Sequence, residues 1–141
     1  MINPDIFSLF SKETDDSQSA YIDFTQSPFY YLYQYQKILS TLDDTKKFLK
    51  YLQKLKKEVD IKEIRKAGEF ILFEKSWESI SNINIEEKEH QEALSENNSL
   101  EFRFYINLSI KHYLELEEYE KCAFLQKILD FLKKIEFSLE N

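Results

Sequence analysis

The sequence predicts an all-α protein, a single irregular bundle of about five helices that ends in an antiparallel helical hairpin. Three observations lead to this fold class. Pro28 is the last proline and Gly68 the only glycine, so the glycine-containing turns that most β-hairpins need are missing. Apolar residues recur at helical spacing in several segments. Hydrophobic residues make up 43% of the chain, which is ample for the core of one domain over residues 1–141.

The first helix is expected over residues 28–42. Ser27 can cap it with its hydroxyl, and Pro28 suits the first helical position because its missing N–H would be unpaired there. Apolar residues follow at helical spacing, namely Tyr31, Tyr35, Ile38 and Leu42. Upstream, the polar residues 11–20 are expected to form a loop after the short apolar segment 6–10.

A separate amphipathic helix is expected over residues 45–59, started by Asp43 or Asp44. Its apolar stripe comprises Phe48, Leu49, Leu52, Leu55 and Val59. Its opposite side carries a lysine stripe, formed by Lys46, Lys50, Lys54 and Lys57. This pattern is typical of a helix that covers a core with one side and faces water with the other.

A third helix is expected to start at Asp60 and to end near Ile80. Asp60 and Glu63 resemble a capping box, in which each side chain pairs with a free N–H group of the first turn. Gly68 lies inside this helix. A glycine there costs about 1 kcal/mol relative to alanine, so either the close approach of another helix or a kink would account for it.

Residues 100–110 give two conflicting signals. Six apolar residues alternate there with more polar ones, at Leu100, Phe102, Phe104, Ile106, Leu108 and Ile110. Alternation of this kind is typical of a half-buried strand, but the chain offers no second run of comparable quality to pair with it. We therefore favour a buried helix over residues 100–116, capped by Asn98 with Glu101, and keep the strand as the alternative. A last amphipathic helix is expected over residues 118–137.

The segment 110–129 reads IKHYLELEEYEKCAFLQKIL. It contains the run Glu117, Glu118, Tyr119, Glu120, Lys121, Cys122 and Ala123, followed by Leu125 and Ile128. This run resembles the UVR motif, a short antiparallel helical hairpin of nucleotide-excision-repair proteins and bacterial regulatory proteins. The resemblance implies a turn near Glu117 and Glu118 and a role in protein–protein contact rather than in chemistry.

Charge is distributed unevenly along the chain. The net charge is −7, which disfavours nucleic acid as a partner. Residues 46–66 nevertheless hold nine basic and three acidic side chains, between two acidic blocks. The favoured interpretation is that these blocks lie against each other in the fold, and the alternative is a surface for a charged partner. Residues 84–99 are expected to form an acidic connection, with a helical turn or two around residues 86–94.

The sequence also bears on the compartment. Cys122 is the only cysteine, which excludes an intrachain disulfide and favours a reducing compartment. The first ten residues lack the basic flank and the length of a signal peptide. No apolar stretch approaches the length of a transmembrane helix. We therefore expect a cytoplasmic protein that does not contact a membrane.

Few residues are candidates for chemistry. Glu87 and His90 have the spacing of a di-iron helix, but that site needs a second such pair, so a solvated surface is favoured. His112 is expected on a helical surface or at the boundary of the core, bonded to Glu115 or to a backbone carbonyl. Cys122 lies on the apolar face of the last helix and is expected to be a small core residue. We expect no catalytic site, no cofactor and no metal.

The leading hypothesis is a non-catalytic intracellular interaction or adaptor protein whose partner is another protein, with a homo-oligomer as an alternative. The candidate interaction residues are Tyr30, Tyr33, Lys46, Lys50, Lys54, Lys57, Glu86, Glu87, Glu89 and Tyr119. A second hypothesis is an acidic inhibitor, of the immunity or counter-defence type, whose carboxylates between Glu86 and Glu101 bind a basic partner. A third is a carboxylate-bridged metal enzyme that uses Glu87 and His90.

Overall fold

The computed structural model describes residues 18–21, 23–55 and 60–140, and it confirms the all-α fold class. Five helices follow short helical turns at residues 18–21 and 23–25. They are α2 (Pro28–Leu55), α3 (Ile61–Ile80), α4 (Lys88–Glu96), α5 (Leu100–Glu115) and α6 (Tyr119–Glu140). The residues described contain no strand.

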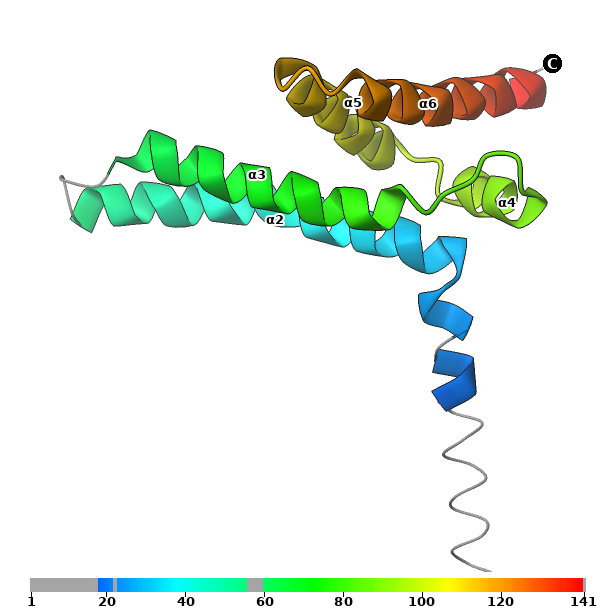
Figure 1. Ribbon diagram of the computed structural model, residues 1–141, viewed down its shortest axis with the longest axis horizontal. Coiled ribbons are helices and arrows are strands. Elements are labelled where there is room, and N and C mark those ends of the chain that lie inside the picture. Colours follow the sequence, from blue (N-terminus) through cyan, green and yellow to red (C-terminus); the bar gives the residue numbers. More distant parts are fainter. Residues whose placement is uncertain (1–17, 22, 56–59, 141) are drawn as a thin grey trace, which may run out of the picture.

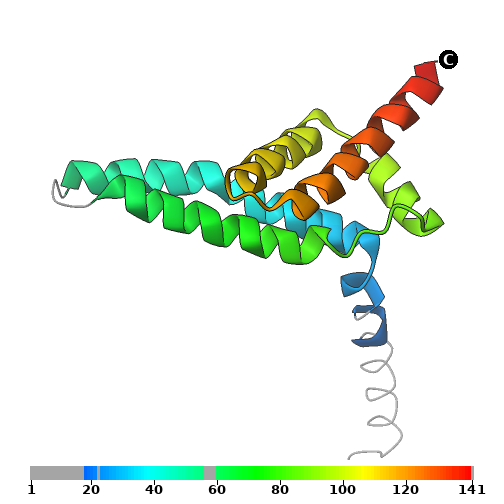
Figure 2. The same ribbon diagram turned by 45° about the horizontal axis from the view of Figure 1, so that its top comes forward.

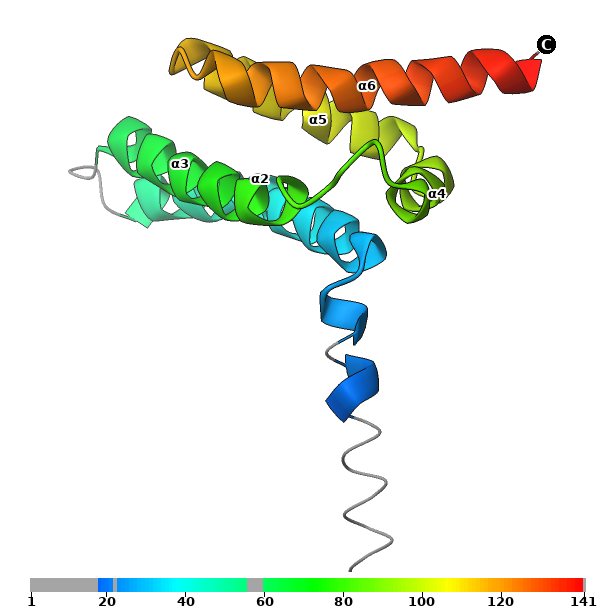
Figure 3. The ribbon, with the colours of Figure 1, turned by 45° about the vertical axis from the view of Figure 1, so that its right-hand side comes forward.

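Two antiparallel helical hairpins form the two layers of the molecule (Figure 1). Helix α2 packs along α3, and α5 packs along α6. Helix α4 lies at the end where the chain leaves α3, and it contacts both α2 and α6. The two layers are also seen apart in Figure 3, and in Figure 2 the α5–α6 hairpin crosses in front of the α2–α3 hairpin. The α2–α3 hairpin extends past the α5–α6 hairpin at the end where α2 gives way to α3 (Figure 1).

The prediction of two helices over 28–42 and 45–59 is wrong, because α2 is continuous from Pro28 to Leu55. The predicted start is confirmed, since the Ser27 hydroxyl accepts a hydrogen bond from the Tyr30 N–H. Asp43 and Asp44 both point to solvent and do not interrupt the helix. The physical reason is the seam with α3, which buries apolar side chains on both sides of the expected break, namely Leu39, Leu42 and Leu49.

The prediction of a mainly irregular acidic connection over 84–99 underestimates its order, since nine of its residues form α4. Only one side of α4 is buried, through His90, Ala93 and Leu94. A helix this short is held by its tertiary contacts rather than by its own propensity. Residues 18–20 are also helical, in contrast to the predicted loop, whose remaining residues lie outside the described part of the chain.

Residues 100–110 are helical, which resolves the ambiguity of their pattern. The buried residues of α5 are Phe102, Ile106, Ser109 and Tyr113, at spacings of three and four. Leu100 and Phe104 are exposed instead, so α5 is less central than its composition predicts. Ser99 rather than Asn98 caps the helix, since its hydroxyl accepts a hydrogen bond from the Phe102 N–H at 3.1 Å.

Two buried tyrosines join the layers. The Tyr35 hydroxyl on α2 donates to the Tyr105 carbonyl and lies 2.6 Å from the Ser109 hydroxyl on α5. The Tyr113 hydroxyl on α5 donates to the Phe73 carbonyl on α3 at 2.8 Å. Burial raises the pKa of both phenols above the ordinary value. Each therefore acts as a neutral hydrogen-bonding group inside the core.

The turn between α5 and α6 ends α5 in a Schellman motif. The Glu118 N–H donates to the Tyr113 carbonyl and the Glu117 N–H donates to the Leu114 carbonyl. Glu117 takes a φ of 60°, in the left-handed region where glycine is favoured.

Glu117→Gly should therefore stabilise the protein by about 1 kcal/mol, because the side chain that opposes this backbone conformation is removed. Urea unfolding measures the difference. Glu117→Ala is the matched control, since it removes the carboxylate but keeps the β-carbon. An equal gain in Glu117→Ala would contradict the conformational cause and point to the charge.

Gly68 lies in α3 beside Thr45 of α2, where a β-carbon would meet only the Thr45 methyl, at 3.9 Å. That is an ordinary van der Waals distance, so the predicted close approach of a helix does not require glycine here. Gly68→Ala should raise stability by up to about 1 kcal/mol in urea unfolding. Ala67→Gly, at the exposed neighbouring position, should lower it by a similar amount. A loss of stability in Gly68→Ala would overturn this view of the seam.

Candidate interaction surfaces

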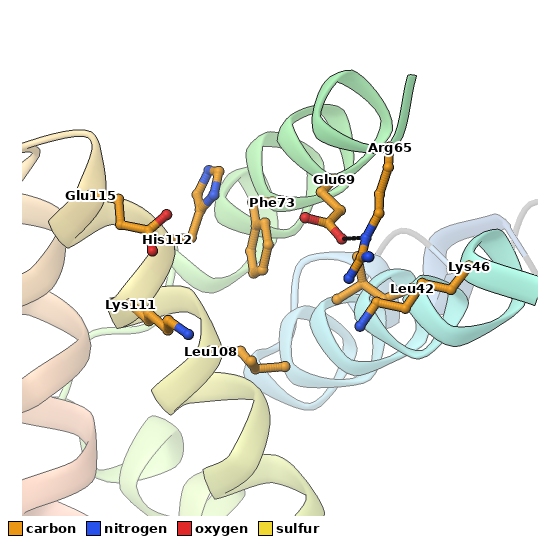
Figure 4. A pocket seen from close by; sticks show the side chains of 9 residues that line it. All are labelled: Leu42, Lys46, Arg65, Glu69, Phe73, Leu108, Lys111, His112 and Glu115. Atoms are coloured by element: carbon orange, nitrogen blue, oxygen red, sulfur yellow. Dashed lines mark hydrogen bonds and ion pairs between the residues drawn. The ribbon is translucent and has the colours of Figure 1, made fainter. Parts of the chain in front are cut away.

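A cleft of about 250 Å³ lies between the α2–α3 hairpin and α5. Leu42, Phe73 and Leu108 supply its apolar wall. The basic groups of Lys46, Arg65 and Lys111 reach into the same space from three different helices (Figure 4). Two carboxylates and an imidazole complete the lining, from Glu69, Glu115 and His112. Arg65 is paired with Glu69 at 2.9 Å, whereas Lys46 and Lys111 form no ion pair with any residue that the structure describes.

His112 forms part of the wall of this cleft. Its ring stacks on that of Phe73, with the ring centres 4.2 Å apart. Its Nε2 atom is buried and lacks a hydrogen-bond partner among the described residues. Burial lowers the pKa of His112, against the opposing effect of nearby carboxylates such as Glu74 and Glu115. The predicted bond to Glu115 or to a carbonyl is not formed by Nε2, and the ring packs on an aromatic side chain instead.

The predicted lysine stripe lies partly on this cleft. Lys46 and Lys50 line a second groove nearer the loop end of the hairpin, together with Lys62 and Arg65. Lys46 and Arg65 belong to both hollows, so one continuous basic surface connects them. Lys54 is exposed in the last described turn of α2, and Lys57 lies outside the described residues.

The apolar stripe predicted on residues 45–59 is only partly covered: Leu52 is half-buried, and Val59 lies outside the described residues. Leu49 is buried against α3, but Phe48 and Leu55 are 60% and 62% exposed. Ile64 and Ile71 of α3 are 45% and 58% exposed. We call these four residues, Phe48, Leu55, Ile64 and Ile71, the outer apolar face. The sequence shows that they are apolar, but not that a two-helix hairpin leaves them without a covering helix.

The outer apolar face lies on the side of the hairpin that points away from α5. Each helical residue is turned by about 100° from the one before, so residues two apart lie on nearly opposite sides. Phe48 follows Lys46 by two positions, and Ile71 precedes Phe73 by two. Lys46 and Phe73 both line the cleft beneath α5. The hairpin therefore has a basic, partly covered side and an apolar, bare side.

The predicted aromatic candidates are not brought together. Tyr33 is exposed on α2, with the Lys37 ammonium 5.6 Å from its ring centre. Tyr30 is half-buried and meets the ring of Phe24 edge-on at 5.5 Å. Tyr119 is exposed at the start of α6. Tyr30 and Tyr33 are three positions apart on α2 and so are neighbours on its surface, whereas Tyr119 lies on α6, so the three side chains do not form one patch.

One of the acidic candidates, Glu87, lies against a structural histidine. His90 is buried, and its Nδ1 accepts a hydrogen bond from the Asn84 N–H at 2.9 Å. Its Nε2 lies 3.1 Å from a carboxylate oxygen of Glu87. The prediction of a solvated surface is therefore wrong for His90, which fastens the α3–α4 connection to α4. Glu86 and Glu89 are exposed beside it.

The remaining candidates for chemistry are isolated. The Cys122 thiol is half-buried 3.6 Å from the Ile110 carbonyl, and burial raises its pKa. Within residues 18–21, 23–55 and 60–140, no group of three or more potential metal ligands occurs.

None of the helices described there combines the length and hydropathy needed to cross a bilayer. No family model, curated protein or solved structure matches the chain.

Proposed function

We propose that this protein is a non-catalytic interaction module that binds an amphipathic helix of another protein on its outer apolar face. The observation that carries the proposal is the exposure of Phe48, Leu55, Ile64 and Ile71 on one side of the α2–α3 hairpin. Soluble proteins seldom leave a cluster of large apolar side chains bare unless it is a contact surface. A cytoplasmic setting, where the lone thiol stays reduced, accords with this role.

The helical nature of the partner follows from the geometry of the hairpin. Two antiparallel helices present a shallow groove, and an amphipathic helix can lay its apolar side along such a groove. The hairpin already receives aromatic side chains of α5 and α6 on its other side, where Trp77 meets Tyr113 and Phe124 edge-on. A partner helix on the outer apolar face would cover it in the same way and complete a bundle.

Site-specific photo-crosslinking in cells tests the proposal. A benzophenone amino acid replaces Phe48 in one variant and Phe104 in a control variant, since both side chains are exposed to a similar degree, at 60% and 58%. The expected product at position 48 joins the chain to a partner segment with apolar residues three and four apart. The double variant Phe48→Lys/Ile71→Lys should lose the associated protein.

Two outcomes would contradict the proposal. Equal cross-linking yields from positions 48 and 104 would show that the contact is not specific to the outer apolar face. A cross-linked product that contains only this chain would show that the face binds a second copy of the same protein and not a different partner. The UVR-like segment remains a separate proposal for protein contact, with Tyr119 among its exposed residues.

An acidic inhibitor is the second candidate function. Four glutamates of the α4 region are exposed and form no ion pair among the described residues, namely Glu86, Glu89, Glu92 and Glu96. Replacing all four with glutamine should strongly weaken binding to a basic partner and reduce the salt dependence of the binding that remains. Unchanged binding would exclude this candidate and leave the outer apolar face as the contact.

A further inference from the structure

The cleft between α2, α3 and α5 has more basic groups than its own carboxylates neutralise. Three cationic side chains and two carboxylates line it, with a neutral imidazole. The Glu69 carboxylate is already bound to Arg65. Glu115 lies beside His112, away from Lys46 and Arg65 (Figure 4). Lys46 therefore remains uncompensated on the side that it shares with Arg65, and Lys111 extends into the cleft from α5 on the opposite side (Figure 4).

The same cleft has a hydrophobic wall. Phe73, Leu42 and Leu108 form the wall against which the basic groups stand. The His112 ring, which stacks on Phe73, borders the same wall.

We propose that this cleft binds a small carboxylic acid anion that carries an apolar group. The carboxylate would lie among Lys46, Arg65 and Lys111, and the apolar group would lie against Phe73 and Leu108. One carboxylate balances the single excess positive charge, and charge-assisted hydrogen bonds from lysine and arginine are among the strongest available to it. Ligand sites combine an apolar wall with a few placed polar groups in this manner.

This site lies on the opposite side of the α2–α3 hairpin from the outer apolar face, so it goes beyond the proposed function. The loss of one need not affect the other. Ligand binding would connect α2, α3 and α5 through one molecule, and it would thereby stabilise the contact between the two layers.

NMR with benzoate as the probe tests the proposal. The chain has two histidines, so the His112 ring signal reports on the cleft while the His90 signal, on α4, serves as an internal control. Benzoate should shift the His112 signal in a saturable manner, with a Kd on the order of 1 mM. Benzamide keeps the ring without the charge, and acetate keeps the charge without the ring. Each should bind at least about threefold more weakly than benzoate.

Lysine variants locate the carboxylate. Lys46→Gln and Lys111→Gln should each weaken benzoate binding by about threefold or more, because each removes one of the unpaired basic groups. Lys88→Gln is the matched control, since Lys88 is exposed on α4 outside the cleft. Circular dichroism confirms that each variant is folded. Equal binding of benzoate and benzamide, or unchanged benzoate binding in both cleft variants, would overturn the proposal.

Discussion

Phe102→Ala should destabilise the protein by about 3–5 kcal/mol, whereas Phe104→Ala should cost less than about 0.5 kcal/mol. The Phe102 side chain is fully buried and meets the ring of Tyr35 edge-on, with the ring centres 5.9 Å apart. Its removal would leave a cavity between α5 and α2 that the surrounding side chains fill only in part. Phe104 has little packing to lose, because 58% of its surface is exposed.

The pair discriminates between the two structures that the sequence allows for this segment. In a strand, residues two apart share a face, so both alanine variants would be costly or both would be tolerated. In a helix the two residues lie on different sides, so their costs differ. Urea unfolding followed by circular dichroism measures both variants. Equal losses of stability would contradict the helical assignment of α5.

Residues 100–110 illustrate how far a local pattern can be interpreted. The alternation of apolar residues there is real, but it describes composition and not burial. Which of them become buried depends on where α2 and α6 lie against α5. Phe102 and Ile106 face these helices, whereas Leu100 and Phe104 point outward. Short-range signals such as the helix starts at Ser27 and Asp60 were predictable, because capping depends only on residues three positions away.

The length of α2 was not predictable, because it depends on packing against α3 rather than on neighbouring residues in the sequence. Two adjacent aspartates form an acceptable helix start, so Asp43 and Asp44 indicate a break. The continuous seam with α3 outweighs that local preference, since Leu42 and Leu49 are buried on either side of the pair. Tertiary packing commonly overrides intrinsic preference in this way.

The candidate surfaces depend even more on tertiary structure. The sequence identifies a lysine stripe, but not that Lys46 meets Arg65 and Lys111 from two other helices around one cleft. It identifies an apolar stripe, but not that Phe48 remains exposed. Both the grouping of the basic residues and the exposure of Phe48 depend on which distant segments pack beside these side chains. The spacing of residues within one helix carries no information about those segments.

Tyr113→Ala should also cost about 3–5 kcal/mol, because Tyr113 holds the two layers together. Its ring is buried and meets Trp77 of α3 edge-on at 5.7 Å. The Lys121 ammonium of α6 lies 4.8 Å from the centre of the same ring, within the range of a cation–π interaction. One side chain thus links α3, α5 and α6, and its truncation would leave the contact between the two hairpins without its central residue.

Tyr113→Phe separates the packing of the ring from the hydrogen bond of the hydroxyl. The Phe73 carbonyl that accepts this bond also accepts one from the Ser76 hydroxyl at 2.9 Å, so it keeps a partner when the phenol is lost. The cost should therefore be only about 0.5–1.5 kcal/mol. Tyr119→Ala, at an exposed position, is the control for tyrosine removal and should change stability by less than about 0.5 kcal/mol.

Trp77 provides a local measurement beside the unfolding curve, because it is the only tryptophan of the chain and contacts the Tyr113 ring. Tyr113→Ala should shift its fluorescence toward that of a solvated indole under conditions where circular dichroism still shows helix. Tyr113→Phe should leave the emission close to that of the unmodified protein. If Tyr113→Phe instead cost as much as Tyr113→Ala, the hydroxyl rather than the ring would be the group that holds α5 to α3.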